Sequence, residues 1–552
     1  MKTTNTLLIF SIFLLNSMTS FAQWSTDPTI NNPIYIGPND QYASRIVSDG
    51  SGGAIIFWGD KRNGTSNVDI YAQHIDSNGV IQWTTDGIAV CTAINNQENI
   101  QVISDGNGGA IITWNDYRNS TSYYDIYAQK INSAGVVQWP NNGIAICTAS
   151  ENNYNPKMVT DGNGGAIITW MDTRTIINNG DIYAQSINSS GIIQWAIDGV
   201  IICDNISQND FPDIASDGNG GAIITWMDTR TSPFDIYAQR INSTGVVQWA
   251  NNGVIVCNAI NSQSYPSITS SNNGSAIITW TDGRSSTNPS DIYAQLINSN
   301  GTVQWTNNGV PICTSADSQN STNIISDGNG GAIITWVDYR TPANSADVFA
   351  QRVNSSGTVQ WTINGVGISR TTGNQWFTNM VTDGNGGAIL TWRDQRVTNS
   401  DIYSQRITSN GIIQWALNGV PVSTATDIQG SPYIASDENG GAIIAWGDYR
   451  SGTNYDVYAQ RINTNGTLSV ENYDNSNNSF VKISPNPSNG LVTVQSTESI
   501  TEFYLINSLG EIIHSEFSQN NFNLTLLSKG VYIYKAISDN NSVSVGKIII
   551  TD

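Results

Sequence analysis

The chain repeats one phrase eight times between residues 47 and 470: Gly-Gly-Ala-Ile-Ile-Thr-Trp-x-Asp-x-Arg, with small variations. Its tryptophans recur at steps of 54 or 56 residues. A fixed period of this size indicates a repeat architecture in which each unit buries its faces against its neighbours. Catalysis usually needs one unique constellation, whereas these residues occur eight times. The Trp, Asp and Arg of the phrase are therefore predicted to be structural: Trp58, Asp60, Arg62, Trp114, Asp116, Arg118, Trp170, Asp172, Arg174, Trp226, Asp228, Arg230, Trp280, Asp282, Arg284, Trp336, Asp338, Arg340, Trp392, Asp394, Arg396, Trp446, Asp448 and Arg450.

Each repeat divides into strand-like segments, with no helical periodicity. In the second repeat four strands are expected at 99–104, 109–114, 125–131 and 135–139, followed by a short coda at 143–147. Gly- and Asn-rich links between them supply the positive φ that tight hairpins need. The second segment is apolar without alternation, which is typical of a strand covered on both faces.

Four antiparallel strands per repeat, punctuated by Trp and Gly, resemble the blades of a β-propeller. The predicted fold is all-β, with an eight-bladed propeller of four-stranded blades over residues 23–470. A string of sandwich domains is the alternative, but such domains usually need about 100 residues each. Seven repeats contain Gly-x-x-Gln-Trp and the eighth lacks it, whereas Gln23-Trp24 stands at the predicted mature N-terminus. We therefore expect the N-terminus to complete the last blade.

The two ends of the chain carry export signals. Residues 1–22 have a basic start, an apolar run and a small-residue cleavage site, which predicts a secretory signal peptide. After a polar linker at 471–479, residues 480–552 form a separate module of short strands that is predicted to be a small β-sandwich. This module contains four ordered segments: Ser-Pro-Asn-Pro-Ser-Asn-Gly from 484, Leu-Ile-Asn-Ser-Leu-Gly from 505, Leu-Ser-Lys-Gly-Val-Tyr from 527 and Gly-Lys-Ile-Ile-Ile from 546.

Together these segments resemble the type A C-terminal sorting domain of type IX secretion cargo. The resemblance implies that residues 480–552 engage the type IX machinery of certain Gram-negative bacteria, and that the protein reaches the outer-membrane surface or is secreted. Cleavage of the domain after export is often part of that route. An ordinary accessory sandwich domain is the alternative.

Charge and cysteine usage exclude several classes of partner and chemistry. The formal net charge is −21, and no basic stripe remains to bind nucleic acid. No later segment approaches the ~18 apolar residues of a transmembrane helix. His74 and His514 lie in different predicted domains, and His74 occupies a variable position that we expect to be exposed. We expect no cofactor and no metal, because one Asp per Gly-rich loop is too few for calcium. The five cysteines repeat at one position and are predicted to be small buried residues rather than disulfide partners: Cys91, Cys147, Cys203, Cys257 and Cys313.

A ligand site is expected where the repeats differ. The segments after each Arg and those leading into each first strand vary most, and both should open on one face of the disc. The second set carries aromatic residues among Asn and Gln, which suit sugar rings or protein partners. The candidate ligand-binding residues are Tyr42, Tyr154, Phe211, Tyr265, Trp376 and Phe377.

Three functions remain open at this point. The first is a secreted or cell-surface propeller that binds glycan or protein without catalysis. The second is a polysaccharide-active hydrolase or lyase with a carboxylate pair. The third is a structural component of the cell envelope. A propeller fold by itself does not choose between them.

Overall fold

The computed structural model describes residues 24–551 except 176–179, 232, 286–288, 342–344, 469–480, 485, 487, 490, 508–511, 515–520, 526 and 540–542. The chain divides into two compact units, one up to Val470 and one from Glu471 onward. The predicted signal peptide (1–22) and the predicted linker (471–479) lie outside the described residues. Among the described residues, no helix is long and apolar enough to cross a bilayer.

The first unit consists of eight four-stranded antiparallel sheets, the blades. Blades 1 to 7 each use four consecutive strands, and blade 8 combines three strands from the end of the unit with one from its start. The first strands are β2 (Gln41–Ser48), β6 (Gln97–Ser104), β10 (Asn153–Thr160), β14 (Asn209–Ser216), β18 (Gln263–Ser270), β22 (Gln319–Ser326), β26 (Gln375–Thr382) and β30 (Tyr433–Ser436). The second strands are β3 (Ala54–Asp60), β7 (Ala110–Asp116), β11 (Ala166–Asp172), β15 (Ala222–Asp228), β19 (Ala276–Asp282), β23 (Ala332–Asp338), β27 (Ala388–Asp394) and β31 (Ala442–Asp448).

The outer half of each blade contains the third and fourth strands. The third strands are β4 (Asp69–Ile75), β8 (Asp125–Ile131), β12 (Asp181–Ile187), β16 (Asp235–Ile241), β20 (Asp291–Ile297), β24 (Asp347–Val353), β28 (Asp401–Ile407) and β32 (Asp456–Ile462). The fourth strands are β5 (Ile88–Cys91), β9 (Ile144–Cys147), β13 (Val200–Cys203), β17 (Val254–Cys257), β21 (Val310–Cys313), β25 (Val366–Ser369), β29 (Val420–Ser423) and, in blade 8, β1 (Asn32–Tyr35). One 3₁₀ turn, η1 (Asn272–Gly274), precedes β19.

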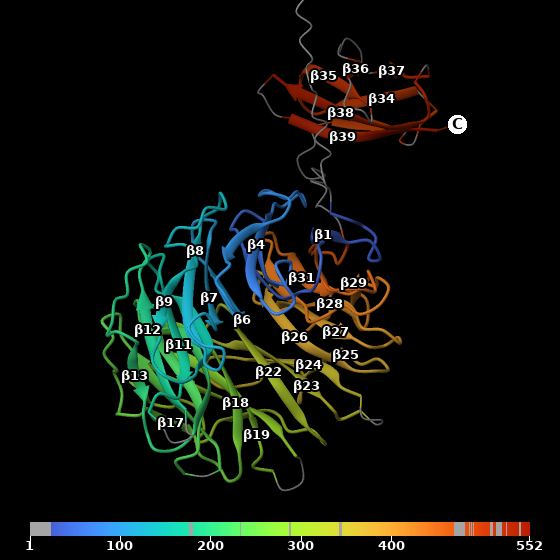
Figure 1. Ribbon diagram of the computed structural model, residues 1–552. Helices are drawn as coiled ribbons and strands as arrows, with labels where there is room; N and C mark the ends of the chain where they lie inside the picture. Colours follow the sequence, from blue (N-terminus) through green and yellow to red (C-terminus); the bar gives the residue numbers. More distant parts are fainter. Residues whose placement is uncertain are drawn as a thin grey trace, which may run out of the picture. The chain divides into compact units, whose positions relative to one another are not determined.

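The blades form a closed ring. Each first strand contacts the first strand of the next blade, and β30 of blade 8 contacts β2 of blade 1. Figure 1 shows the blades following one another around the first unit. Because the first strands are the ones that meet, they surround the central axis. The second strands are buried along most or all of their length, since neighbouring blades cover both of their faces. The predicted eight-bladed propeller is confirmed.

The N-terminal segment closes this ring. Strand β1 pairs with β32, so the first described strand is the outer strand of the last blade. Trp24 is 1% exposed, and its Nε1 donates to the Ser77 carbonyl of blade 1 at 3.0 Å. The same bond links successive blades elsewhere, for example Trp83 to Ser133 and Trp415 to Thr464. Trp24 therefore supplies the tryptophan that the eighth repeat lacks.

The expected fourth strand at 135–139 is wrong, and the coda supplies the strand instead. In blade 2 the segment contributes only an isolated bridge, Ile131 to Val137. The Gln129 side chain accepts the Trp139 N–H at 3.0 Å and donates to the Pro140 carbonyl at 2.9 Å. Since a side chain satisfies these backbone groups, the segment does not pair as a strand. The chain then turns back, and β9 pairs with β8.

The second unit is a β-sandwich. Strands β33 (Val481–Ser484), β34 (Leu491–Ser496) and β37 (Asn521–Asn523) form one sheet. The other has the order β36 (Ile512–His514), β35 (Ile500–Ile506), β38 (Gly530–Ser538) and β39 (Val543–Ile550). Val494, Phe503 and Ile548 are buried together between the sheets. This unit has its own core, as the change in composition predicted.

Candidate ligand-binding site

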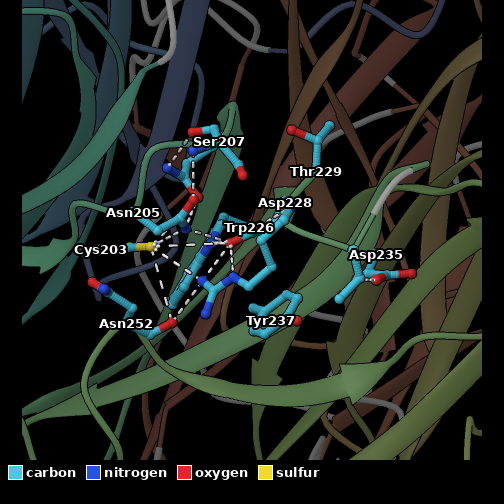
Figure 2. A network of polar contacts seen from close by, with 12 residues as sticks. Cys203, Asn205, Ser207, Trp226, Asp228, Thr229, Asp235, Tyr237 and Asn252 are labelled. Atoms are coloured by element: carbon cyan, nitrogen blue, oxygen red, sulfur yellow. Dashed lines mark hydrogen bonds and ion pairs between the residues drawn. The ribbon is translucent and has the colours of Figure 1, made fainter.

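The repeated Trp, Asp and Arg form a buried cluster in every blade. The Trp Nε1 donates to the Asp Oδ2 at 2.6–3.2 Å in all eight blades. Figure 2 shows the cluster of blade 4, where Trp226 and Asn205 both donate to Asp228. The Arg230 guanidinium pairs with the same carboxylate and lies 3.9 Å from the centre of the Tyr237 ring. Both carboxylate oxygens of Asp228 are engaged, since its Oδ1 accepts the backbone N–H of Arg230.

The cysteines belong to the same clusters. All five are buried and unpaired. Each sulfur lies 3.0–3.3 Å from the Arg Nη2 of the following blade. Burial raises the pKa of Cys91 to about 12 and that of Cys203 to about 11, so both thiols stay protonated at neutral pH. A thiol, unlike a thiolate, is a poor nucleophile, so the buried cysteines are suited to packing rather than to chemistry.

His74 is not exposed as expected, because it pairs with the Asp of a Gly-rich loop. Its Nε2 lies 2.8 Å from Asp49 Oδ2, and its side chain is 13% exposed. Burial alone would raise the pKa of Asp49, but the bond with His74 and bonds from the Ser51 and Gly53 N–H groups outweigh it and lower the pKa. Most other blades place Lys or Arg at the His74 position, as in Arg240 with Asp217 at 2.8 Å. The loop Asp thus stabilises a turn and anchors the third strand.

The six aromatic candidates lie within the first strands, not in the loops before them. Each first strand of blades 1 to 7 has a bulge near its start, seen as a register shift against the second strand. Tyr42, Tyr154 and Trp376 are the second residues of their strands. All three are only partly exposed.

The other three candidates are the third residues of their strands, where the bulge imposes positive φ. Phe211, Tyr265 and Phe377 have φ of 50°, 54° and 54°, and they are 40%, 54% and 53% exposed. A positive φ is unusual for a residue other than glycine, asparagine or aspartate. Neighbouring members of this series touch, since the Phe211 and Tyr265 rings are 4.9 Å apart and edge-on. The third residues therefore lie along the rim around the axis, which we call the bulge rim.

Sequence reasoning missed the polar members of the bulge rim. Asn99, Asn155 and Ser321 have φ of 52°, 55° and 56° at the same position. Asn99 donates to Asn155 Oδ1 at 3.4 Å, so neighbouring blades also meet there. One repeated sequence feature marks the bulge position. A buried Gln or Asn begins each first strand of blades 1 to 7, and the bulge residue follows two positions later. The rim thus combines an amide arc in blades 2 and 3 with aromatic residues in blades 4, 5 and 7.

Two pockets occupy equivalent junctions beside the bulge rim. One, of ≈410 Å³, lies between blades 2 and 3 and is lined by Glu98, Asn99, Tyr124 and Tyr154 among others. The other, of ≈450 Å³, lies between blades 6 and 7 and includes Trp376. Blades 3 and 4 have the buried Met171 and Met227 at the position of Asn115 and Val337, and Met227 Sδ accepts the Tyr265 N–H of blade 5 at 3.2 Å. The structure therefore brings Tyr154 and Trp376 into separate pockets and does not gather the six candidates into one site.

Acidic residues neighbour the bulge rim in blades 2 and 4, namely Glu98 and Asp210. Burial raises the pKa of Asp210, which neighbours Phe211 in the chain. Burial, followed by the charges of Glu98 and Asp40, raises the pKa of Tyr42 to about 12. Arg393 pairs with Trp376 between β26 and β27, so residues of both charge signs lie near the rim.

Comparison with known proteins identifies the C-terminal unit. Residues 482–551 match the family model described as secretion system C-terminal sorting domain. The predicted type IX sorting domain is confirmed, and it implies export to the cell surface or beyond it and an interaction with the secretion machinery. No curated protein matches the chain.

Several solved structures are similar to parts of the chain. A protein of unknown function from Dyadobacter fermentans is 10% identical over 56% of this chain and 93% of its own, with a TM-score of 0.35. An ulvan lyase bound to a GlcA–Rha3S fragment is 12% identical over 66% and 93%, with a TM-score of 0.37. An α-L-arabinofuranosidase of Fusarium graminearum is 12% identical over 59% and 98%, with a TM-score of 0.31. At these TM-scores the similarities carry no argument about this chain.

Proposed function

We propose that this protein is a ligand-binding propeller, displayed on the cell surface or released, that holds a glycan or a protein on its bulge rim. The observation that carries the proposal is the trio Phe211, Tyr265 and Phe377, which are exposed and held at positive φ. An L-residue pays about 1–2 kcal/mol for such a conformation. Because these rings are exposed, they bury little apolar surface on folding and so stabilise the native state only slightly. They do offer large contact areas to a partner.

The rest of the propeller supports binding rather than catalysis. In blade 4 the repeated carboxylate is saturated by hydrogen bonds from Trp226, Asn205 and Arg230. A hydrolase needs one carboxylate free to transfer a proton and a second placed opposite it. The rim instead offers aromatic rings and amides, which recognise a ligand without transforming it.

Glycine substitution tests this function directly. Phe211→Gly, Tyr265→Gly and Phe377→Gly should each leave the unfolding free energy unchanged or raise it, because glycine adopts positive φ without strain. Binding to glycan and protein panels should nevertheless weaken. Ser321→Gly is the matched control, since it changes the same rim position (φ 56°) without removing a ring or an amide.

Two results would overturn the proposal. One is full binding by the triple glycine variant with any ligand that the native protein binds. The other is depolymerisation of a polysaccharide by the purified protein, which would favour the hydrolase or lyase alternative.

A further inference from the structure

The pocket between blades 6 and 7 is an uncharged site with an aromatic wall. It has a volume of ≈450 Å³ and is lined by Asn320, Thr322, Asn323, Tyr339, Trp376 and Phe377, together with small or apolar neighbours. The Trp376 and Phe377 rings meet edge-on, with centres 6.4 Å apart. The lining includes no charged side chain, on a protein with a net charge of −21.

Several polar groups of this pocket have no protein partner. Among the described residues, Trp376 Nε1 and Thr322 Oγ1 are buried without a hydrogen bond. Asn323 also makes no side-chain hydrogen bond among those the structure shows, whereas Asn379 at the same position in blade 7 donates to the Pro432 carbonyl at 2.9 Å. A buried polar group without a partner destabilises the native state, and native proteins keep few of them. Hydroxyl groups of a ligand would supply the missing partners.

The equivalent pocket between blades 2 and 3 differs in this respect. There Asn99 donates to Asn115 Oδ1 at 3.1 Å, and Asn115 donates to the Asn153 carbonyl at 2.8 Å. Its amides are occupied by one another, and Glu98 adds a carboxylate. The two pockets lie at equivalent strand positions, so they differ in their side chains.

Resting on the function proposed above, we propose that the blade 6–7 pocket is a subsite for a neutral sugar residue. The sugar ring packs on the Trp376 indole, and its hydroxyl groups bond with Asn323 and with the unpartnered Trp376 N–H and Thr322 hydroxyl. An aromatic face with amide neighbours and no charge suits an uncharged pyranose or furanose. A uronate or sulfate ester would lose hydration without gaining a cation, because none lines the pocket.

A glycan array followed by calorimetric titration tests the subsite. The mature full-length protein is screened against neutral, uronate-containing and sulfated oligosaccharides. We expect neutral glycans to bind. Trp376→Ala should weaken the best neutral ligand more than about tenfold, and Asn323→Ala about three- to tenfold. Tyr154→Ala, at the same strand position in the blade 2–3 pocket, should stay within about twofold.

Fold integrity is checked by thermal unfolding, and Trp376→Phe keeps a ring while removing the indole N–H, so partial loss is expected from it. Exclusive binding of uronates or sulfates would overturn the subsite. Full affinity in Trp376→Ala would do the same. If the rim glycine variants lose binding while Trp376→Ala keeps it, the proposed function survives and the subsite does not. If no glycan or protein binds the native chain, both fail.

Discussion

Asp401 differs from its counterparts because the residue after the repeated arginine cannot donate a hydrogen bond to it. In blades 1, 2, 3, 4 and 6 the Asn or Thr at that position donates to the aspartate that opens the third strand, as Thr175 does to Asp181. Blade 7 has Val397 there, and Val397 is 54% exposed. Burial, followed by the charge of Asp394, raises the pKa of Asp401 to about 6.

Val397→Thr should therefore stabilise the protein near neutral pH. The folded pKa of Asp401 lies above the unfolded value of 3.8, so its contribution is fully present below pH 3.8 and is lost as pH rises through about 6. A hydroxyl donor favours the charged form and should recover about 0.5–1.5 kcal/mol at pH 7, with little change at pH 4. Denaturant midpoints at the two pH values measure this. Thr175→Val should show the opposite sign, and an equal gain at both pH values would contradict the assignment.

At the scale of the blade, a second set of hydrogen bonds joins neighbouring blades, at the other end of the third strands from the contact between the repeated Arg and Cys. Arg240 of blade 4 and Trp249 both donate to the Ser299 carbonyl of blade 5, each at 3.1 Å. Arg461 and Trp24 do the same to Ser77 across the closure. At the junction of blade 1 with blade 2, the described hydrogen bonds to the Ser133 carbonyl include the one from Trp83 but none from an arginine, because His74 stands at the arginine position. A pocket of ≈650 Å³ lies at that junction, with His74 and Ser133 in its wall.

His74→Arg should strengthen the junction between blades 1 and 2. The longer side chain keeps the pairing with Asp49 and reaches the Ser133 carbonyl, as Arg240 reaches Ser299. We expect a gain of about 0.5–1.5 kcal/mol in unfolding free energy, measured by denaturant titration. Leu296→Arg is the control, because Ser271 replaces the loop Asp of that blade and leaves the new cation without a carboxylate. A gain from Leu296→Arg as large as that from His74→Arg would refute this account.

The whole propeller depends on a seam between its two ends. Strand β1, Trp24 and Tyr35 all come from the start of the chain, and Tyr35 stacks on Trp58 of blade 1 at 5.7 Å. In blade 8 Tyr35 pairs with Val457. It thus takes the place in the register that Cys91 has in blade 1, where Cys91 pairs with Ile70. One short segment therefore contacts both sides of the closure.

Deleting residues 24–36 should open this seam. The deletion removes a fully buried tryptophan, whose loss alone costs about 3–5 kcal/mol, and it leaves the edge of β32 unpaired. Calorimetry should show a large fall in the melting temperature of the propeller, together with concentration-dependent association through the exposed strand. A melting temperature close to that of the intact protein would sink the closure argument.

Deleting residues 480–552 should leave the propeller folded and block its delivery. The two units have separate cores, and the sorting domain supplies the export signal. The truncated protein should keep the propeller melting transition and accumulate in the periplasm, as cell fractionation would show. Normal surface delivery of the truncated protein would contradict the role of this domain.

The sequence by itself determined the number of blades, the closing tryptophan and the sorting domain, because each is written as a local pattern or a constant spacing. Trp24 could be matched to the missing Gln-Trp pair without coordinates. Tertiary structure decided what depends on contacts between blades. The strand at Ile144–Cys147 replaces the expected one because the Gln129 side chain occupies the backbone groups of residues 139–140. Phe377 lies on a strained rim rather than in a loop, because a bulge in β26 turns its backbone to positive φ. The pocket beside Trp376 is lined by Val337 of blade 6, at a position where blades 3 and 4 have methionine, and periodicity along one chain does not reveal such packing between neighbours.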